Sequence, residues 1–305
     1  MLFDSFILRI KNSCSLKVCL LAFLGYVALP AASHVSADEV DRRVDDVLIK
    51  AERLDQRLAD VNVMVENSIA IEAAGTKLDV AKTKPLMLKA VSQTFDPLRM
   101  RQAILAAIGE PDGDYQNFEA LEEAVSALTV SYAQIDKMYT DRDEAAANSA
   151  QARLGNPKTK ETVNDVANMM ASPKLAADAA SFQQAVGAAL KISSDRGIYE
   201  LDEEDQKKFL ADLPSFLANL REREVNESAY SRTLTEEYAL NELSYALAML
   251  SDDQLDTLKD FYSSPIGIAK TESLEKSYKY IVRENTLKAI DKYFESLFAA
   301  RIKKN

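Results

Sequence analysis

Apolar residues recur at alternating intervals of four and three along the segment 38–75. This spacing corresponds to the a and d positions of nearly four heptads and places the apolar residues on one narrow stripe of a helix. The stripe consists of Val40, Val44, Val47, Ala51, Leu54, Leu58, Val61 and Val65. The pattern predicts one long helix. Its stripe either pairs with another helix, in a coiled-coil dimer or a docking contact, or packs along its own protein.

From residue 84 to the C-terminus the apolar positions again follow a helical period, and we find no sustained alternation of apolar and polar residues. Pro85 predicts the first turn of one helix, and Asp96 followed by Pro97 predicts the cap and first residue of another. The sequence Gly-Asn-Pro at 155–157 is typical of a helix end. With 8 Gly and 8 Pro in 305 residues, the chain lacks the turns of a sheet-rich protein. We expect an all-α fold.

Two segments 92 residues apart share a Ser-Pro pair with similar flanking residues. Ser172 aligns with Ser264, and Ala177 aligns with Ala269. Chance matching in a chain rich in Ser and Ala is the alternative explanation. A duplication predicts two helical-bundle units that follow the heptad-patterned helix. Their expected ranges are 84–192 and 193–305.

The second of these segments carries several helix-start signals. Ser251 and Gln254 match a capping box, in which each residue bonds the backbone N–H of the other. Ser264 then predicts a new cap, with a proline at the first helical position. Gly267, in the first turn of that helix, would allow close approach to the preceding helix.

These residues resemble a known family. The run Leu-Ser-Asp-Asp-Gln-Leu at 250–255 and the run Phe-Tyr-Ser-Ser-Pro-Ile-Gly at 261–267 are similar to the core motif of the bacterial domain of unknown function numbered twenty fifty-nine. The resemblance covers about residues 230–300 and implies a small helical domain secreted into Gram-negative envelopes. Met169 and Leu175 depart from this motif in the first segment. The family has no established activity, so the resemblance implies only a fold and a compartment.

The first 37 residues have the three-part pattern of a secretory signal peptide. Arg9, Lys11 and Lys17 form a basic region, an apolar run covers 18–29, and small residues lead to Ala37. The apolar run is too short for a comfortable membrane span. We therefore predict a periplasmic protein that is cleaved after Ala37, and an uncleaved anchor is the alternative.

Cleavage at this position would remove Cys14, Cys19 and His34 from the chain, and the sequence contains no Trp. Without Cys or His, the mature chain cannot assemble a Ser-His-Asp or Cys-His nucleophile. It also lacks the usual ligands of zinc, copper and haem iron. We therefore expect no catalytic centre, no metal site and no cofactor.

The predicted mature chain is strongly acidic. The first 37 residues hold three of the 37 Lys and Arg and one of the 48 Asp and Glu, so the remaining chain has a net charge of −13. This charge disfavours nucleic acids and anionic lipid surfaces as partners. We expect an envelope protein or polymer as the partner, or self-association through the heptad-patterned helix. We expect no nucleic-acid partner and no stable membrane insertion after cleavage.

Aromatic residues near the C-terminus provide candidates for a binding surface. Tyr230, Tyr238 and Tyr245 fall near one helix face and can line a groove for a glycan or peptide, or form core with their hydroxyls at its rim. The other surface candidates are the motif residues Phe261, Tyr262, Ser264, Pro265 and Gly267.

The leading hypothesis is a non-enzymatic envelope protein that binds or scaffolds a partner through helical surfaces. One alternative is a carboxylate-based hydrolase directed at peptidoglycan. Glu227 is its candidate general acid, because the Glu-Ser pair at 227–228 is similar to that of lytic transglycosylases, although their Gly-rich and Gln-containing motifs are missing. A second alternative is a small-molecule carrier with a pocket between helices.

Overall fold

The computed structural model describes residues 37–109, 115–141, 144–195 and 228–302, together with some positions between 202 and 215. Within these residues the regular structure consists of twelve helices, without a strand. The prediction of an all-α fold is therefore confirmed.

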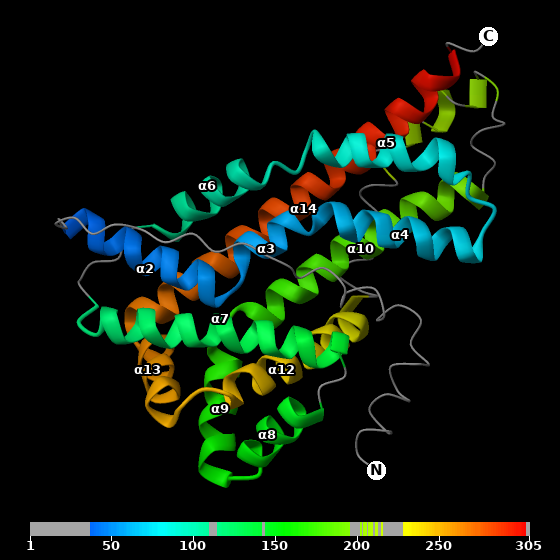
Figure 1. Cartoon of the computed structure of the whole chain (residues 1–305). Helices are drawn as coiled ribbons and strands as arrows, with labels where there is room; N and C mark the ends of the chain where they lie inside the picture. The colour runs from blue at the N-terminus through cyan, green and yellow to red at the C-terminus, as the bar shows by residue number, and fades with distance from the viewer. Residues whose placement is uncertain are drawn as a thin grey trace.

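Figure 1 shows the order and arrangement of these helices. In chain order they are α2 (Ala37–Ala51), α3 (Leu54–Ala59), α4 (Val61–Gly75), α5 (Val80–Ser92), α6 (Pro97–Ile108), α7 (Phe118–Asp141), α8 (Glu144–Leu154), α9 (Pro157–Met169), α10 (Ser172–Asp195), α12 (Ser228–Ala248), α13 (Asp252–Ser263) and α14 (Pro265–Ile302).

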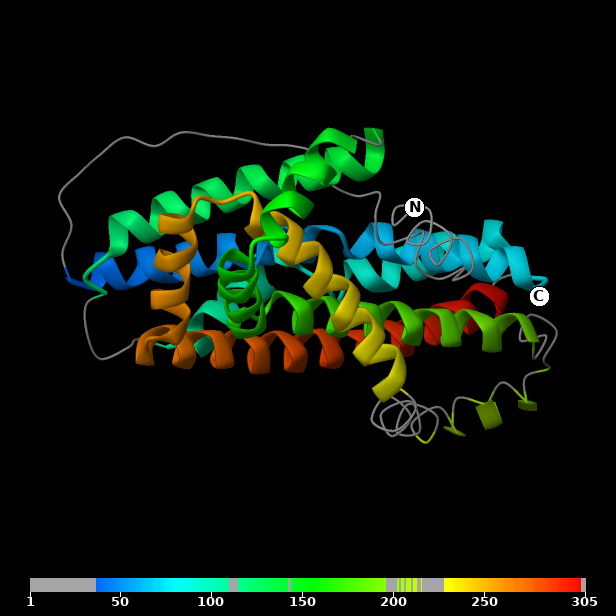
Figure 2. The same cartoon turned by 90° about the horizontal axis from the view of Figure 1, so that it is seen from below.

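The long helix α14 organises the body. The helices α5, α6 and α10 pack along it, and α13 joins its N-terminal end. Figure 2 shows α7 and α14 along opposite long sides of the molecule. One hydrophobic core extends from Val44 to Phe298, so it includes side chains from both predicted units, 84–192 and 193–305.

The segment predicted as a single helix over 38–75 forms three helices. The first break follows Ala51, where Arg53 adopts a left-handed backbone conformation with φ of 54° before α3 begins. Asp60 separates α3 from α4. The sequence at the first break contains no Gly or Pro, which explains why the pattern did not reveal it.

The heptad stripe is a core face of this chain. Its described side chains are 8 % exposed or less and belong to the common core. They are Val44, Val47, Ala51, Leu54, Leu58, Val61 and Val65. The stripe therefore packs along its own protein and is not exposed to a second chain in this structure. The backbone of Val40 lies in α2, and its side chain is outside the described residues.

Several predicted helix starts are confirmed. The Asp96 side chain accepts hydrogen bonds from the backbone N–H groups of Leu98 and Arg99 at 3.1 and 3.2 Å. Both hydrogen bonds of the Ser251–Gln254 capping box are present. The expectation for Pro85 is wrong, because α5 already begins at Val80, and its cap is the Asp79 side chain.

The start of α14 depends on a close approach of backbone to backbone. The Ser264 hydroxyl accepts a hydrogen bond from the N–H of Gly267 at 3.0 Å. A Cβ atom on Gly267 would lie 2.0 Å from the carbonyl oxygen of Phe261. The predicted role of Gly267 in close helix approach is therefore confirmed.

A buried ion pair fixes the other side of this helix start. The Lys270 side chain is 2 % exposed and pairs with Asp45 of α2. Its ammonium group also donates to the carbonyl oxygen of Gly109 at 3.3 Å, just after α6. Lys270 thus connects α14 with α2 and with the end of α6.

Candidate functional site

Glu52 is a fully buried acidic residue in the turn between α2 and α3. Its Oε1 atom accepts hydrogen bonds from the Tyr262 hydroxyl at 2.8 Å and from the backbone N–H of Ala171 at 3.0 Å. Its Oε2 atom is buried without a hydrogen-bond partner. Tyr262 belongs to α13, and Ala171 immediately precedes α10. We call Glu52, Tyr262 and Ala171 the Glu52 hub, because they join three separate parts of the fold.

The environment of the hub favours the neutral carboxyl group. Burial raises the pKa of Glu52 above its usual 4.5, although the hydrogen bond from Tyr262 opposes this shift. Burial and the neighbouring Glu52 carboxyl also raise the pKa of the hydroxyls of Tyr262 and Tyr132. The Ser172 hydroxyl lies close enough to lower the pKa of Glu52, but it makes no hydrogen bond of normal geometry.

Arg57 of α3 ties the same elements together through the backbone. Its Nε donates to the carbonyl oxygen of Glu52 at 3.1 Å, and a terminal nitrogen donates to the carbonyl oxygen of Ser172 at 3.1 Å. The Glu52 carboxyl group and the Arg57 guanidinium group therefore both join the α2–α3 turn to the break before α10.

A second polar group lies beside the hub, and we call Arg53, Asp60, Asp136 and Glu242 the Arg53 cluster. The Arg53 guanidinium lies 4.4 Å from the ring centre of Tyr132 and pairs with Asp136 at 3.3 Å and Glu242 at 3.9 Å. Burial raises the pKa of all three carboxyl groups in the cluster. Shifted carboxyl groups beside a left-handed, non-glycine residue are features that mark candidate functional sites.

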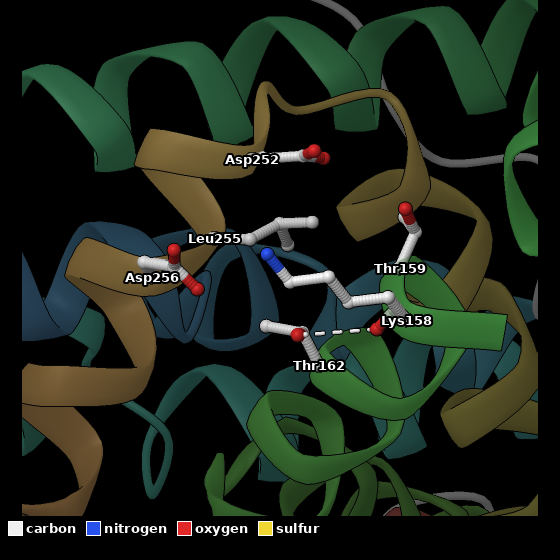
Figure 3. A pocket seen from close by; sticks show the side chains of 6 residues that line it. All are labelled: Lys158, Thr159, Thr162, Asp252, Leu255 and Asp256. Carbon is white, nitrogen blue, oxygen red and sulfur yellow. Dashed lines mark hydrogen bonds between the residues drawn. The ribbon is translucent and has the colours of Figure 1, made fainter. Parts of the chain in front are cut away.

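The surface also has a shallow polar groove where α8, α9 and α13 meet. It encloses about 380 Å³ and adjoins a smaller pocket of about 10 Å³, which has room for about one water molecule. The groove is lined by Ser149, Ala152, Arg153, Asn156, Thr159 and Asp252. Figure 3 shows the smaller pocket, which shares Thr159 and Asp252 with the groove. Two charged residues that line the groove, Arg153 and Asp252, pair with one another at 2.8 Å.

The outer side of α6 combines exposed apolar residues with two polar ones, Arg99 and Gln102. The inner side of this helix buries Met100, Ile104 and Ile108, whereas Leu98 on the outer side is 73 % exposed. The other exposed apolar residues of this helix are Ala103, Ala106 and Ala107. The structure therefore gives three candidate sites of different chemistry: a buried acidic one, a polar groove and a helix face with exposed apolar residues.

The structure separates the predicted surface candidates. Phe261 and Tyr262 are each 1 % exposed, and Gly267 is buried, so these three belong to the core and not to an exposed surface. Ser264 is partly buried and acts as the cap of α14, and Pro265 is exposed.

The tyrosine candidates lie along α12. Tyr238 is partly buried, and Tyr245 packs against the hydrophobic core. The backbone of Tyr230 belongs to α12, and its side chain lies outside the described residues. Glu227, the candidate general acid, also lies outside them.

Sequence reasoning missed Glu52 and Arg53 as site residues. Both lie in the heptad segment, where the spacing places them on the polar faces of one continuous helix. The break at Arg53 turns Glu52 into the core instead. No local signal for this break is present in the sequence.

No group of three or more His, Cys, Asp or Glu side chains among the described residues is arranged to hold a metal ion. None of the helices in that part of the chain has the length and apolar character needed to cross a membrane.

No family model, no curated protein and no solved structure matches this chain. The resemblance of the C-terminal motif to the family numbered twenty fifty-nine is therefore an expectation that the sequence motif alone supports.

Proposed function

We propose that this chain is a non-enzymatic binding or scaffolding protein of the bacterial periplasm, and that it acts through the outer face of α6. The observation that carries the proposal is the composition of this helix. Eight of its twelve residues are Ala, Ile, Leu or Met, and they occur on both sides. The solvent side of a surface helix is normally polar, yet that side of α6 presents Leu98 and three alanines beside Arg99 and Gln102. A partner protein would cover that side.

Neighbouring helices also carry exposed apolar residues. Val80 begins α5 and is 38 % exposed, while Ile268 and Tyr280 of α14 are 47 % and 66 % exposed. Both helices pack against one another, and α6 packs on α14. Single exposed apolar residues are common, but several on adjoining helices favour an interaction surface.

The charges near α6 are already paired within the chain. Arg101 bonds Asp46 at 2.6 Å and Asp55 at 3.0 Å, which fixes α6 to α2 and α3. Arg99 lies 3.4 Å from Asp96. Apolar contact would therefore dominate recognition. The exposed alanines leave room for large side chains, so the partner of this proposal presents an apolar helix.

The N-terminal pattern supports the compartment. A basic region, a short apolar run and small residues precede Ala37, as in secretory signal peptides. The resemblance of the residues near 250–267 to a family of secreted helical proteins points to the same compartment. An envelope protein is therefore the partner that this proposal favours, and an envelope polymer is the other partner class.

Site-specific photo-crosslinking in cells that express the protein naturally tests this function. A crosslinking residue placed at Ala103 should give one dominant protein adduct, and the additional change Leu98→Glu should abolish it. The matched control is a crosslinking residue at Ser126, an exposed position on α7. Identical adducts from both positions, or none at Ala103, would contradict the proposal.

The hydrolase alternative has its own test. Purified protein that cleaves peptidoglycan, and loses this activity with Glu227→Gln, would replace the binding proposal. The carrier alternative predicts a small molecule that remains bound through purification.

A further inference from the structure

The α2–α3 joint, formed by Glu52 and Arg53, combines three unusual properties. It separates α2 from α3, it contains a non-glycine residue with φ of 54°, and it places a carboxyl group in the core. A left-handed conformation costs free energy for a residue with a Cβ atom. Contacts around the joint must therefore hold it in place, and each of these contacts is a point at which it can be released.

The contacts on Glu52 come from several elements. Tyr262 of α13 and the N–H preceding α10 bind Oε1, and Arg57 of α3 binds the backbone carbonyl. The Tyr132 hydroxyl of α7 lies 3.4 Å from the carbonyl oxygen of Ala51. The Oε2 atom has no partner, so an ionised Glu52 would leave part of its charge in a dry site.

Acidic groups outnumber basic groups around the joint. The carboxyls are those of Glu52, Asp60 between α3 and α4, Asp136 of α7 and Glu242 of α12; the facing cations are Arg53 and Arg57. The other titratable groups facing the joint are Tyr132 of α7, Tyr262 of α13 and Tyr278 of α14. Full ionisation of the four carboxyls would leave a net negative charge around the joint, where Glu52 is fully buried and the other three carboxyls are partly buried.

We infer that the α2–α3 joint is a proton-linked hinge. With Glu52 protonated, the joint stays packed against α10 and α13. With Glu52 ionised, the joint opens, because water must reach Oε2 to hydrate the charge. This device operates within the chain and does not depend on which partner covers α6.

The direction of the pH effect follows from the raised pKa of Glu52. The folded protein holds the proton more tightly than the unfolded chain, whose Glu52 has a pKa of about 4.5. Stability from this group is therefore fully present below about pH 4.5 and is lost as the pH rises through the folded pKa. Burial shifts the pKa of Asp60, Asp136 and Glu242 in the same direction.

The test is hydrogen–deuterium exchange of the purified protein at several values between about pH 4.5 and pH 9, corrected for the intrinsic exchange rate. The readout is the backbone amide of Ala171, whose acceptor is Glu52. In the wild type, protection of this amide should fall at least tenfold across the range. In Glu52→Gln, which mimics the neutral acid, protection should stay constant within about twofold.

Two further variants keep the outcome decisive. Asp253→Asn alters an exposed carboxyl of α13 and should preserve the wild-type profile. Tyr262→Phe removes a hydrogen bond that lowers the pKa of Glu52, so it should move the transition to higher pH. A wild-type profile without a transition would overturn the inference, and so would a Tyr262→Phe profile with an unshifted transition. The Tyr262→Phe criterion applies even if Glu52→Gln does not fold.

Discussion

The Ser-Pro helix starts of α10 and α14 have the same dipeptide but satisfy their backbone groups differently. At α14, Ser264 is the cap, and its hydroxyl accepts from the N–H of Gly267. At α10, Ala171 occupies the cap position, and the Ser172 hydroxyl makes no hydrogen bond. The N–H of Ala171 donates instead to the carboxyl group of Glu52, which lies 119 residues earlier in the chain.

This difference separates a local start from a tertiary one. The hydrogen bond that caps the start of α14 joins residues of the same short segment, so it needs no contact with a distant part of the chain. The start of α10 is complete only after the α2–α3 joint has packed against it. The two starts also differ by one residue in register, because the proline is the first helical residue of α14 and the second of α10. The shared residues therefore do not produce identical structures, and the duplication stays a hypothesis.

The largest expected effect is that of Gly267→Ala. The added Cβ would lie 2.0 Å from the carbonyl oxygen of Phe261, and backbone atoms cannot move aside as a flexible side chain can. We expect a loss of about 3 kcal/mol or more in the free energy of unfolding, measured by denaturant titration. The control is Gly75→Ala, which meets no atom within 4 Å and should change stability by about 1 kcal/mol or less. Equal stability of the two variants would show that the close approach at Gly267 does not exclude a larger residue from the start of α14.

A smaller effect is expected for Glu52→Ala. This change leaves the Tyr262 hydroxyl and the Ala171 N–H buried without their acceptor, at a cost of about 2–4 kcal/mol. Hydrogen exchange should accelerate at the start of α10 and remain slow at the start of α14. The control is Glu123→Ala on the exposed side of α7, which should stay within about 0.5 kcal/mol of wild type. Equal acceleration at both starts would show that α10 is not specifically dependent on Glu52.

The smallest effects separate the two serines directly. Ser264→Ala removes a helix cap and should cost about 1 kcal/mol. Ser172→Ala removes a buried hydroxyl without a hydrogen bond and should change stability by less than about 0.5 kcal/mol. Thermal unfolding of both variants under identical conditions measures the difference. If Ser172→Ala proves as costly as Ser264→Ala, the two starts are capped alike.

The sequence predicts those features whose cause lies within a few residues. Asp96 and Ser251 identify helix starts because their side chains bond N–H groups two or three positions ahead. Gly267 is recognisable for the same reason, since its neighbour across the contact is only six residues away. Helical periodicity likewise gave the all-α fold.

The candidate site depends on contacts that sequence spacing does not contain. The residues at the α2–α3 joint fit a continuous heptad, and the contacts on the broken joint come from Tyr132 of α7, Tyr262 of α13 and Ala171 before α10. Glu52 was therefore assigned to a polar helix face, although the structure buries it completely. The exposure of Leu98, Ala103 and Ala107 likewise depends on how α6 packs, which their apolar spacing does not reveal.

The contact between Glu52 and Tyr262 also has a consequence for how the chain is made. The two residues are 210 positions apart. At translation rates of about 5–20 residues per second, Glu52 is synthesised about 10–40 s before its partner. A chain that ends before α13 holds a carboxyl group that belongs in the core and has no hydroxyl to receive it. Incomplete chains therefore cannot finish the fold around this residue, and the native structure forms only once nearly the whole protein is present.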